Sequence, residues 1–414
     1  MDHIHTHAID PAKLDAVVGR AIADISAGYG GVMISIGAKL GLYKAMADSG
    51  PLTSREIARR AGCAERYVRE WLGSQVAGGY VAYHAISDTY ELTPEQAMVL
   101  ADEDSPVFIP NAWAVPASMW ADEEKAIVAF RTGAGIAWGD HDGRLFCGVA
   151  AFYRNGYKAS LVPEWLPALD GVVDRLKAGA IVADIGCGHG HSTVLMAEAF
   201  PKSKFRGFDT HGESVVESQR IAAEAGVTDR TTFAMASAEN YPGTGYDLIC
   251  FFDCLHDMGD PLAAAEHAAR SIAPDGTVML VEPFANDNVG DNISPVARMY
   301  YAASTTICCA HAISEGGHMV LGAQAGEARL ADIFRKAGFT RFRRAFETPF
   351  NLILEARLSP PPPSSPPSIG GEVASRRLDG VGVDPHLPCL LEVGARRRGR
   401  SITPSPHPEP FSPA

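Results

Sequence analysis

Short apolar runs alternate with helix-periodic segments through the second half of the chain. The runs, each as long as a buried strand, are 181–184, 204–208, 231–236 and 246–252. The segments between them have a helical period, beginning with His191–Phe200. Near the end of this region, Arg341–Glu347 and Phe350–Arg357 flank Thr348-Pro349 and predict a closing antiparallel hairpin. Strands that alternate with helices are typical of the α/β class with a mainly parallel sheet.

The first of these runs ends in a glycine-rich loop. Residues 184–190 read Asp-Ile-Gly-Cys-Gly-His-Gly, and a predicted helix follows directly. A strand, a tight glycine turn and a helix N-terminus form the place where a nucleotide-like ligand sits in an α/β fold. Glycine matters because a side chain would block the approach of the ligand to the backbone. On its own the loop is as consistent with a structural turn as with a binding site.

Polar residues stand at the carboxyl ends of the other predicted strands. Asp209 follows the second strand, about twenty residues after the glycine loop, which is the spacing at which a carboxylate accepts hydrogen bonds from ribose hydroxyls. Ser237-Ala238-Glu239 follows the third strand and Asp253 the fourth. Ligands of open parallel sheets bind along this edge, so we expect these residues to meet at one site.

Together these residues resemble the class I S-adenosylmethionine-dependent methyltransferases. Further matches are Ala273-Pro274-Asp275-Gly276-Thr277 before the fifth strand and Ala337-Gly338-Phe339 before the sixth. The resemblance covers roughly 171–358. More weakly, 20–100 is similar to the N-terminal winged-helix domain of small-molecule O-methyltransferases, and about 15–358 is similar to a group of bacterial two-domain methyltransferases.

The resemblance implies a Rossmann-like, seven-stranded sheet with one antiparallel strand, and S-adenosyl-L-methionine as the cofactor. It also implies that the methionine part lies near the glycine loop, the ribose on Asp209 and the adenine near Ser237–Glu239. The cofactor-binding candidates are Asp184, Gly186, Gly188, Gly190, Asp209, Thr210, Ser237, Ala238, Glu239 and Asp253. We predict no metal site, because His189, His211 and Asp253 lack a paired ligand spacing.

A histidine just after the fourth strand is the catalytic candidate. His256 lies in the segment 253–261, where Asp260-Pro261 predicts the start of a helix. It matches the position of the general base in plant-type O-methyltransferases, whose motif reads His-Asp-Trp, although Met258 replaces the Trp here. His256 is therefore either the base that deprotonates a hydroxyl acceptor or a packing and hydrogen-bonding residue. Asp257 is a candidate for orienting it.

Two segments outside the sheet are expected to border the acceptor. The aromatic-rich stretch 105–170 predicts a set of short helices, either as a pocket wall or as a hydrophobic core between domains. The long insertion 283–325 predicts a helix near Pro295–Ala310 that covers the acceptor site, with Tyr300 and His311 as contacts.

The first hundred residues carry the signals of a winged helix. Apolar positions over 13–48 predict two helices separated by Gly28, Gly30 and Gly31. A capping box at Thr53–Glu56 begins the next helix. The remaining elements are predicted to be a helix end at Ala61, a helix over Ala64–Gly73, and strands at Tyr80–His84 and Tyr90–Thr93. Five basic residues stand against six acidic ones over 54–95, which speaks against DNA binding. The resemblance to O-methyltransferases implies instead that this domain packs a homodimer and closes the substrate pocket.

Composition narrows the class of partner and the location. The formal net charge of −13 disfavours a polyanion partner. No run of eighteen apolar residues and no signal pattern occurs, so we expect no membrane span. Eight cysteines without a C-x-x-C pair indicate reduced thiols and a cytoplasmic protein. The predicted layout is a disordered N-terminus at 1–12, a winged-helix or dimerisation domain at 13–100, a helical linker at 101–170, a methyltransferase domain at 171–358 and a disordered Pro-, Gly- and Arg-rich tail at 359–414.

The favoured function is S-adenosylmethionine-dependent methyl transfer to a small-molecule acceptor, a hydroxyl of an aromatic or polyketide-like compound. One alternative is a ligand-sensing transcriptional regulator that keeps the methyltransferase-like domain as a sensor and uses the winged helix on DNA. Another is an NAD-dependent dehydrogenase, against which the G-x-G-x-G spacing speaks, because dinucleotide sites read G-x-G-x-x-G.

Overall fold

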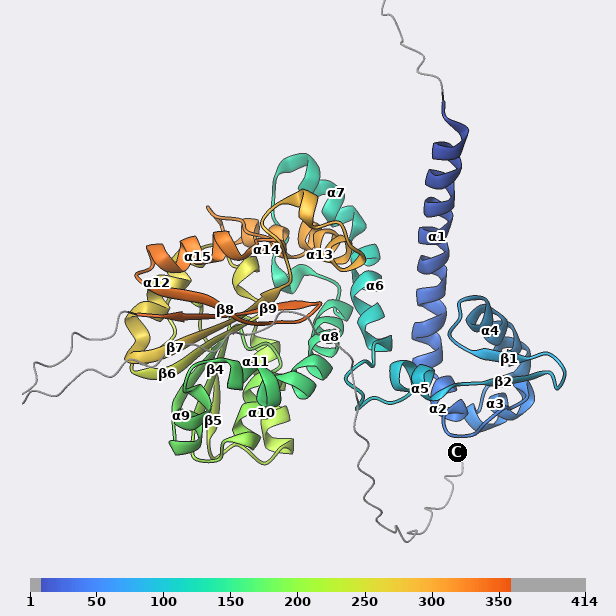
Figure 1. The fold of residues 1–414 in the computed structure, drawn as a ribbon, viewed down its shortest axis with the longest axis horizontal. Coiled ribbons are helices and arrows are strands. Elements are labelled where there is room, and N and C mark those ends of the chain that lie inside the picture. The colour runs from blue at the N-terminus through green and yellow to red at the C-terminus, as the bar shows by residue number, and fades with distance from the viewer. Residues whose placement is uncertain (1–8, 359–414) are drawn as a thin grey trace, which may run out of the picture. The chain divides into compact units, whose positions relative to one another are not determined.

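The computed structural model describes residues 9–358 (Figure 1). The segments predicted to be disordered at the two ends of the chain lie outside the described residues, apart from 9–12. Ile9 and Asp10 precede a helix, and Asp10 caps it, because its side chain accepts hydrogen bonds from the backbone N–H groups of Ala12 and Lys13.

A seven-stranded sheet forms the centre of the C-terminal region. The strands are β3 (Ile181–Ile185), β4 (Lys204–Asp209), β5 (Thr231–Met235), β6 (Tyr246–Phe252), β7 (Ile272–Pro283), β8 (Arg341–Glu347) and β9 (Asn351–Arg357). Their order across the sheet is β5-β4-β3-β6-β7-β9-β8. Only β9 runs antiparallel to its neighbours β7 and β8, while the other pairs are parallel. The predicted α/β fold with one antiparallel strand is confirmed.

Helices cover both faces of this sheet (Figure 1). They are α9 (Val172–Ala178), α10 (His191–Ala199), α11 (Gly212–Glu224), α12 (Pro261–Ser271) and α15 (Glu327–Lys336). Successive strand residues face opposite sides, so Leu248 joins the core under α10 and α11 while Ile249 joins the core under α12 and α15. All strand ends that carry the predicted site residues therefore meet at one edge of a rigid, doubly covered sheet.

The insertion between β7 and α15 contains a short turn and two helices. They are η6 (Val289–Asp291), α13 (Pro295–Thr306) and α14 (Cys308–Ser314). The predicted single helix over Pro295–Ala310 is thus divided at Ile307, whose ψ of −75° departs from a regular helix. This division gives α14 its own direction and brings His311 to the site described below.

The N-terminal elements form a winged helix, as predicted. They are α1 (Pro11–Lys39), α2 (Leu42–Met46), α3 (Ser54–Ala61), α4 (Glu65–Ala77), β1 (Ala82–His84), β2 (Thr89–Glu91) and α5 (Pro94–Leu100). Thr53 and Glu56 form the predicted reciprocal capping box, and Gly62 ends α3 in the left-handed region with φ of 65°. The helix predicted to end at Gly73 continues for one more turn.

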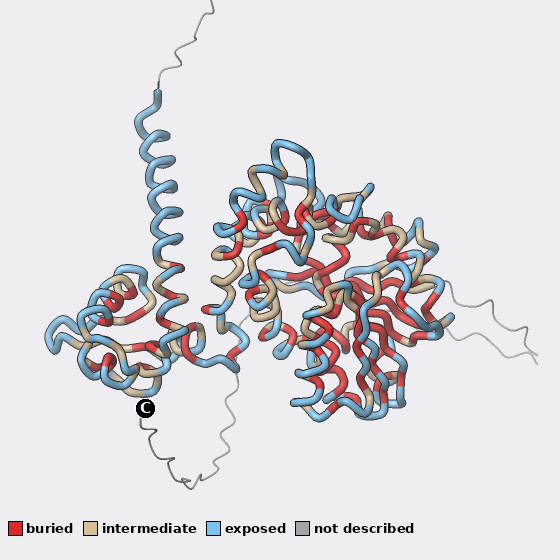
Figure 2. The backbone as a smooth tube through the Cα atoms, turned by 180° about the vertical axis from the view of Figure 1, so that it is seen from behind, coloured by how far each residue is buried: buried red, intermediate tan, exposed pale blue. Residues whose placement is uncertain are grey.

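The prediction of two helices separated by Gly28, Gly30 and Gly31 is wrong, because α1 is one helix of 29 residues. Packing explains part of this result. A Cβ on Gly31 would lie 2.1 Å from Trp113 Cζ3, and a Cβ on Gly37 would lie 2.5 Å from Trp71 Cζ2, so both glycines admit an indole against the helix. Most of α1 is exposed (Figure 2). The helix is long and apolar enough to span a membrane, but the core helices of soluble proteins meet the same two criteria. Of its most apolar stretch of 18 residues, 17% is buried.

The linker region is helical, as expected, and contains one long helix. Its elements are η1 (Pro110–Trp113), α6 (Ala114–Ala121), α7 (Glu123–Thr132), η2 (Trp138–Asp140), α8 (Arg144–Ser160), η3 (Leu161–Trp165) and η4 (Leu166–Ala168). Leu145 of α8 packs with Tyr300, Ile307 and Cys308 in a buried cluster. The linker therefore holds the insertion in place beside the carboxyl edge of the sheet.

Candidate active site

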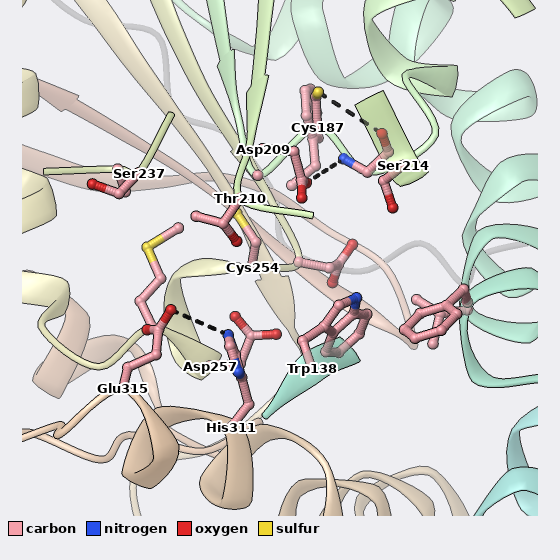
Figure 3. A pocket seen from close by; sticks show the side chains of 18 of the residues that line it. Trp138, Cys187, Asp209, Thr210, Ser214, Ser237, Cys254, Asp257, His311 and Glu315 are labelled. Atoms are coloured by element: carbon pink, nitrogen blue, oxygen red, sulfur yellow. Dashed lines mark hydrogen bonds and ion pairs between the residues drawn. The ribbon is translucent and has the colours of Figure 1, made fainter. Parts of the chain in front are cut away.

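A cavity of about 540 Å³ lies at the carboxyl edge of the sheet (Figure 3). Its lining comes from the glycine loop after β3, the segments that follow β4, β5 and β6, helix α8, and the end of α14. Eight of the ten predicted cofactor-binding residues line it: Gly186, Gly188, Asp209, Thr210, Ser237, Ala238, Glu239 and Asp253. The expectation that residues from four strand ends meet agrees with this geometry.

The glycine loop has three left-handed residues with different surroundings. Gly186, Gly188 and Gly190 have φ of 68°, 51° and 73°. A Cβ on Gly186 would lie 2.8 Å from Cys254 Sγ, and a Cβ on Gly190 would lie 2.8 Å from Ser218 Cβ, whereas a Cβ on Gly188 would meet nothing within 4 Å. Gly186 and Gly190 thus permit internal packing, and Gly188 leaves an open cradle on the cavity side where a ligand can approach the backbone.

Asp184 lies behind the glycine loop, outside the cavity lining. It is fully buried, and its Oδ2 accepts hydrogen bonds from Ser192 Oγ at 2.7 Å and Thr193 Oγ1 at 2.5 Å. Burial raises the pKa of Asp184 to about 6, against the lowering effect of the two hydroxyls. The carboxyl group therefore ties the end of β3 to the first turn of α10, which fixes the loop between them.

Asp209 holds the cavity side of the same loop. Its Oδ2 accepts a hydrogen bond from the Gly188 N–H, and its Oδ1 accepts one from the His211 N–H, both at 2.8 Å. These bonds connect the end of β4 to the glycine loop of β3. His211 also stacks on Phe146 with ring centroids 4.9 Å apart, so an aromatic residue of α8 closes this side of the cavity.

Asp253 joins three elements at the end of β6. It is a non-glycine residue with φ of 50°. Its Oδ2 accepts a hydrogen bond from Tyr157 Oη at 2.6 Å, and its Oδ1 accepts one from Asn351 Nδ2 at 2.7 Å. Burial raises the pKa of Asp253 to about 8. Because both oxygens have protein partners, Asp253 connects α8 and β9 to the floor of the cavity.

His256 is buried beside the cavity and does not belong to its lining. Its Nδ1 lies 2.6 Å from Glu282 Oε2, and the Leu255 N–H donates to the other Glu282 oxygen at 3.0 Å. Burial lowers the pKa of His256, but the Glu282 carboxylate outweighs this effect and holds the pKa well above its usual value. His256 is therefore a protonated partner of a buried carboxylate, with only 4% of its surface exposed.

Ionisable groups that do line this end of the cavity are Asp257, Asp260, His311, Glu315 and His318. Burial raises the pKa of Asp257 to about 7. His311 Nε2 lies 3.5 Å from Glu315 Oε1, and Glu315 Oε2 accepts a hydrogen bond from the Gly259 N–H at 2.8 Å. Figure 3 shows the His311–Glu315 pair on the side of the pocket opposite Asp209. Glu315 was not predicted, because nothing near it in sequence relates it to the strand ends.

Aromatic side chains form the remaining wall. The linker provides Trp138, Phe146, Tyr153 and Tyr157, all of which line the cavity. Tyr300, a predicted contact, is buried elsewhere, and its hydroxyl donates to the Phe350 carbonyl at 2.9 Å. The linker therefore contributes an aromatic wall to the cavity, as the pocket-wall interpretation predicted. Over residues 9–358 no group of three or more His, Cys, Asp or Glu side chains is arranged to hold a metal.

The sheet with one reversed strand, the glycine loop and the acids along its edge define the class I methyltransferase fold. Comparisons with known proteins agree. Residues 157–341 match a family described as a methyltransferase domain, and 28–102 match the Rv2258c-like winged HTH domain. The chain belongs to the two-domain class I S-adenosylmethionine-dependent methyltransferases that carry this N-terminal winged helix.

Sequence relatives match only part of this chain. The 27-O-demethylrifamycin SV methyltransferase of Amycolatopsis mediterranei is 33% identical over 107 residues, which are 25% of this chain and 39% of the relative. A trans-aconitate 2-methyltransferase of Methylobacterium radiotolerans is 30% identical over 141 residues, which are 34% of this chain and 50% of the relative. The chain thus spans half or less of the length of these relatives.

Solved structures match over most of the chain at low identity. The mitomycin 7-O-methyltransferase MmcR is 18% identical with a TM-score of 0.60, covering 84% of this chain and 100% of that one. Human N-acetylserotonin methyltransferase, solved in complex with SAM, is 15% identical with a TM-score of 0.61, covering 83% of this chain and 98% of that one. These likenesses show a shared two-domain fold.

Proposed function

We propose that the chain transfers a methyl group from S-adenosyl-L-methionine to a hydroxyl of a small aromatic or polyketide-like acceptor. The observation that carries the proposal is the open backbone at Gly188, which lies within hydrogen-bond distance of Asp209 in a cavity of about 540 Å³. Cavities of this size are typical of sites for cofactors and small molecules. When bound, the cofactor supplies an activated methyl group on a sulfonium.

The cofactor would lie along the carboxyl edge of the sheet. Gly186 and Gly188 would hold the methionine part, Asp209 and Thr210 the ribose, and Ser237, Ala238 and Glu239 the adenine. Asp184, Gly190 and Asp253 would support this arrangement through their internal contacts rather than by touching the ligand. For Asp184 and Gly190 this division is supported by their position outside the cavity lining, and for Asp253, which lines the cavity, by the protein partners of both its oxygens.

An aromatic hydroxyl acceptor fits the wall on the linker side. Trp138 and Phe146 have ring centroids 5.8 Å apart, and Tyr153 stacks near-parallel on Tyr157 at 5.7 Å. Such a surface favours a flat apolar molecule, because aromatic rings gain both buried area and ring contacts there. The related proteins include the mitomycin 7-O-methyltransferase and the 27-O-demethylrifamycin SV methyltransferase, which supports a small-molecule hydroxyl as the acceptor.

We further propose a cytoplasmic homodimer formed through α1. Val18, Ile22, Ile25 and Tyr29 are spaced at three and four residues, so they form one stripe along the helix, and each is between 46% and 76% exposed. A stripe of this kind is favourable only when another apolar surface covers it. A regulator that reads DNA is less well supported, since the winged-helix region has no excess of positive charge.

Calorimetric titration of the purified chain with S-adenosylhomocysteine tests the cofactor proposal, with NAD as the control ligand. Micromolar binding of the first ligand alone supports it. Binding of NAD, or of neither ligand, would contradict it. An acceptor screen centred on phenols, with labelled S-adenosylmethionine, then tests the transfer itself.

A further inference from the structure

We propose that His311, paired with Glu315, is the base that takes the acceptor's hydroxyl proton, in place of His256. This assignment rests on the methyl transfer proposed above. It follows from a comparison of His256, just after β6, with His311 of α14, because the two histidines differ in access and in partners.

His256 is closed off from the acceptor. Its ring is enclosed between Glu282, at 2.6 Å from Nδ1, and the thiol of Cys308, which also interacts with the ring. Both Glu282 oxygens are engaged, one by His256 and one by the Leu255 N–H. A proton acceptor must reach the proton directly or through one water, and the His256 ring lies outside the cavity lining. His256 therefore serves the loop 253–258 as a buried anchor.

His311 has the opposite properties. Its side chain lines the cavity, and its pKa is lowered by burial, so the ring is neutral at neutral pH. Its Nδ1 is buried without a hydrogen-bond partner among the described residues, so Nε2, which lies 3.5 Å from Glu315 Oε1, is the nitrogen that would take the proton. The groups that act on its charge are Glu315 and Asp209, which favour the protonated ring, and His141, which disfavours it. Asp257 lines the same cavity.

Glu315 is held ready to stabilise the protonated ring. Its Oε2 is fixed by the Gly259 N–H at 2.8 Å, which leaves Oε1 directed to His311. A carboxylate so placed strengthens a base, because it interacts with the imidazolium that forms and not with the neutral ring. Trp138 meets the His311 ring edge-on with centroids 5.9 Å apart, and it also belongs to the aromatic wall. An acceptor ring lying on this wall would thus have its hydroxyl near His311.

The step balances without any further reactant. The O–H bond of the acceptor breaks, and its proton moves to the imidazole of His311. The oxygen lone pair forms the new O–C bond to the methyl carbon. The S–C bond breaks at the same time, and the electron pair of that bond stays on sulfur. The positive charge of the sulfonium is thereby replaced by that of the His311 imidazolium, which faces the Glu315 carboxylate and later releases its proton to water.

The test measures proton transfer in the bound state, apart from turnover. The full chain is saturated with S-adenosylhomocysteine, and 4-nitrophenol is added as a probe whose phenolate absorbs visible light. Native protein should show phenolate at a lower pH than free 4-nitrophenol does. His311→Gln should raise the pH of half-deprotonation of the bound probe by about one unit or more, with S-adenosylhomocysteine affinity unchanged. Glu315→Gln should raise it by a smaller amount.

Two further variants identify the base. His84→Gln is the matched control, because His84 Nε2 pairs with Glu91 at 2.8 Å on the exposed β1–β2 hairpin, away from the cavity. It should leave the titration as in native protein. An equal shift with His256→Gln and none with His311→Gln would overturn the assignment and return the role to His256. Methyl transfer in the phenol screen should fall ~10²-fold or more in His311→Gln.

The outcomes separate this inference from the proposed function. If native protein methylates phenols and His311→Gln does so equally well, the base assignment fails while the function stands. If native protein binds S-adenosylhomocysteine but neither binds 4-nitrophenol nor methylates any phenol, the proposed acceptor class fails and the assignment falls with it. If S-adenosylhomocysteine itself does not bind, the methyltransferase function fails.

Discussion

Two alanine substitutions in the glycine loop should have different consequences, although the residues are only two positions apart. In Gly188→Ala the cost in the free protein is the left-handed backbone alone, about 1–2 kcal/mol, because the new methyl group meets nothing within 4 Å. Gly186→Ala carries the same backbone cost and also places a methyl 2.8 Å from Cys254 Sγ. Overpacking of this kind costs about 1–3 kcal/mol more.

Cys254 cannot easily give way to that methyl group. It is buried, and its thiol donates to the Ile185 carbonyl at 3.1 Å. The sum for Gly186→Ala is therefore about 2–5 kcal/mol of lost folding free energy. Gly188→Ala instead puts its methyl group into the cavity, where it should weaken S-adenosylhomocysteine binding about tenfold or more, equivalent to about 1.4 kcal/mol.

Urea unfolding of the free protein and calorimetric titration of the ligand measure the two effects separately. Gly186→Ala should have the lower unfolding free energy. Gly188→Ala should stay more stable than Gly186→Ala and yet bind S-adenosylhomocysteine more weakly than the native chain does. Equal stability of the two variants would refute the role assigned to the Cys254 contact. Unchanged affinity in Gly188→Ala would refute the placement of the cofactor against this part of the backbone.

Three further predictions follow from buried charge and exposed apolar surface. Glu282→Ala should lower the unfolding free energy by about 3–5 kcal/mol in urea denaturation, because it leaves the His256 charge buried without its partner; the exposed Arg66–Glu70 pair is the control, and Glu70→Ala should cost less than about 1 kcal/mol. Asp257→Asn should become more stable relative to the native chain as the pH rises from about 4 to about 7. Burial raises the pKa of Asp257 in the folded chain to about 7, so the stability that the protonated carboxyl contributes is fully present below the unfolded pKa and is lost as the pH rises through the folded pKa. An equal difference between the two chains in urea unfolding at about pH 5 and about pH 8 would contradict this. Ile22→Glu with Ile25→Glu should convert a dimer to a monomer in light scattering, because both side chains belong to the exposed stripe of α1, whereas Arg20→Glu on the same helix should not; a monomeric native chain would refute the interface.

The sheet and the glycine loop could be predicted from sequence because their signals are local. A buried parallel strand appears as an apolar run, and a loop that a ligand approaches requires glycine at its turn, so Ile181–Gly190 shows both in ten residues. The capping box at Thr53–Glu56 is equally local, since its two hydrogen bonds join residues three apart. Elements of this kind need no knowledge of the tertiary fold.

The acid–base residues could not be ranked in the same way. His256 and His311 are both plausible from their residue type, and 55 positions separate them. Contacts distant in sequence distinguish them. Glu282 pairs with His256 and favours its protonated form, while the break at Ile307 turns α14 so that His311 reaches the cavity. The charge state and the accessibility of each histidine depend on these contacts, which cannot be predicted from the spacing of residues in the sequence.

The glycines of α1 show where a local rule fails and where a cause outside the single chain is needed. A glycine costs about 1 kcal/mol relative to alanine within a helix, so three in the span 28–31 predict a break. Trp113 against Gly31 accounts for one of them. Gly28 and Gly30 have nothing within 4 Å of a built Cβ, yet the helix continues through them beside the exposed Ile25 and Tyr29. Glycine at these two positions would allow a second copy of the chain to pack closely against this part of α1, which is the surface that we propose for the homodimer.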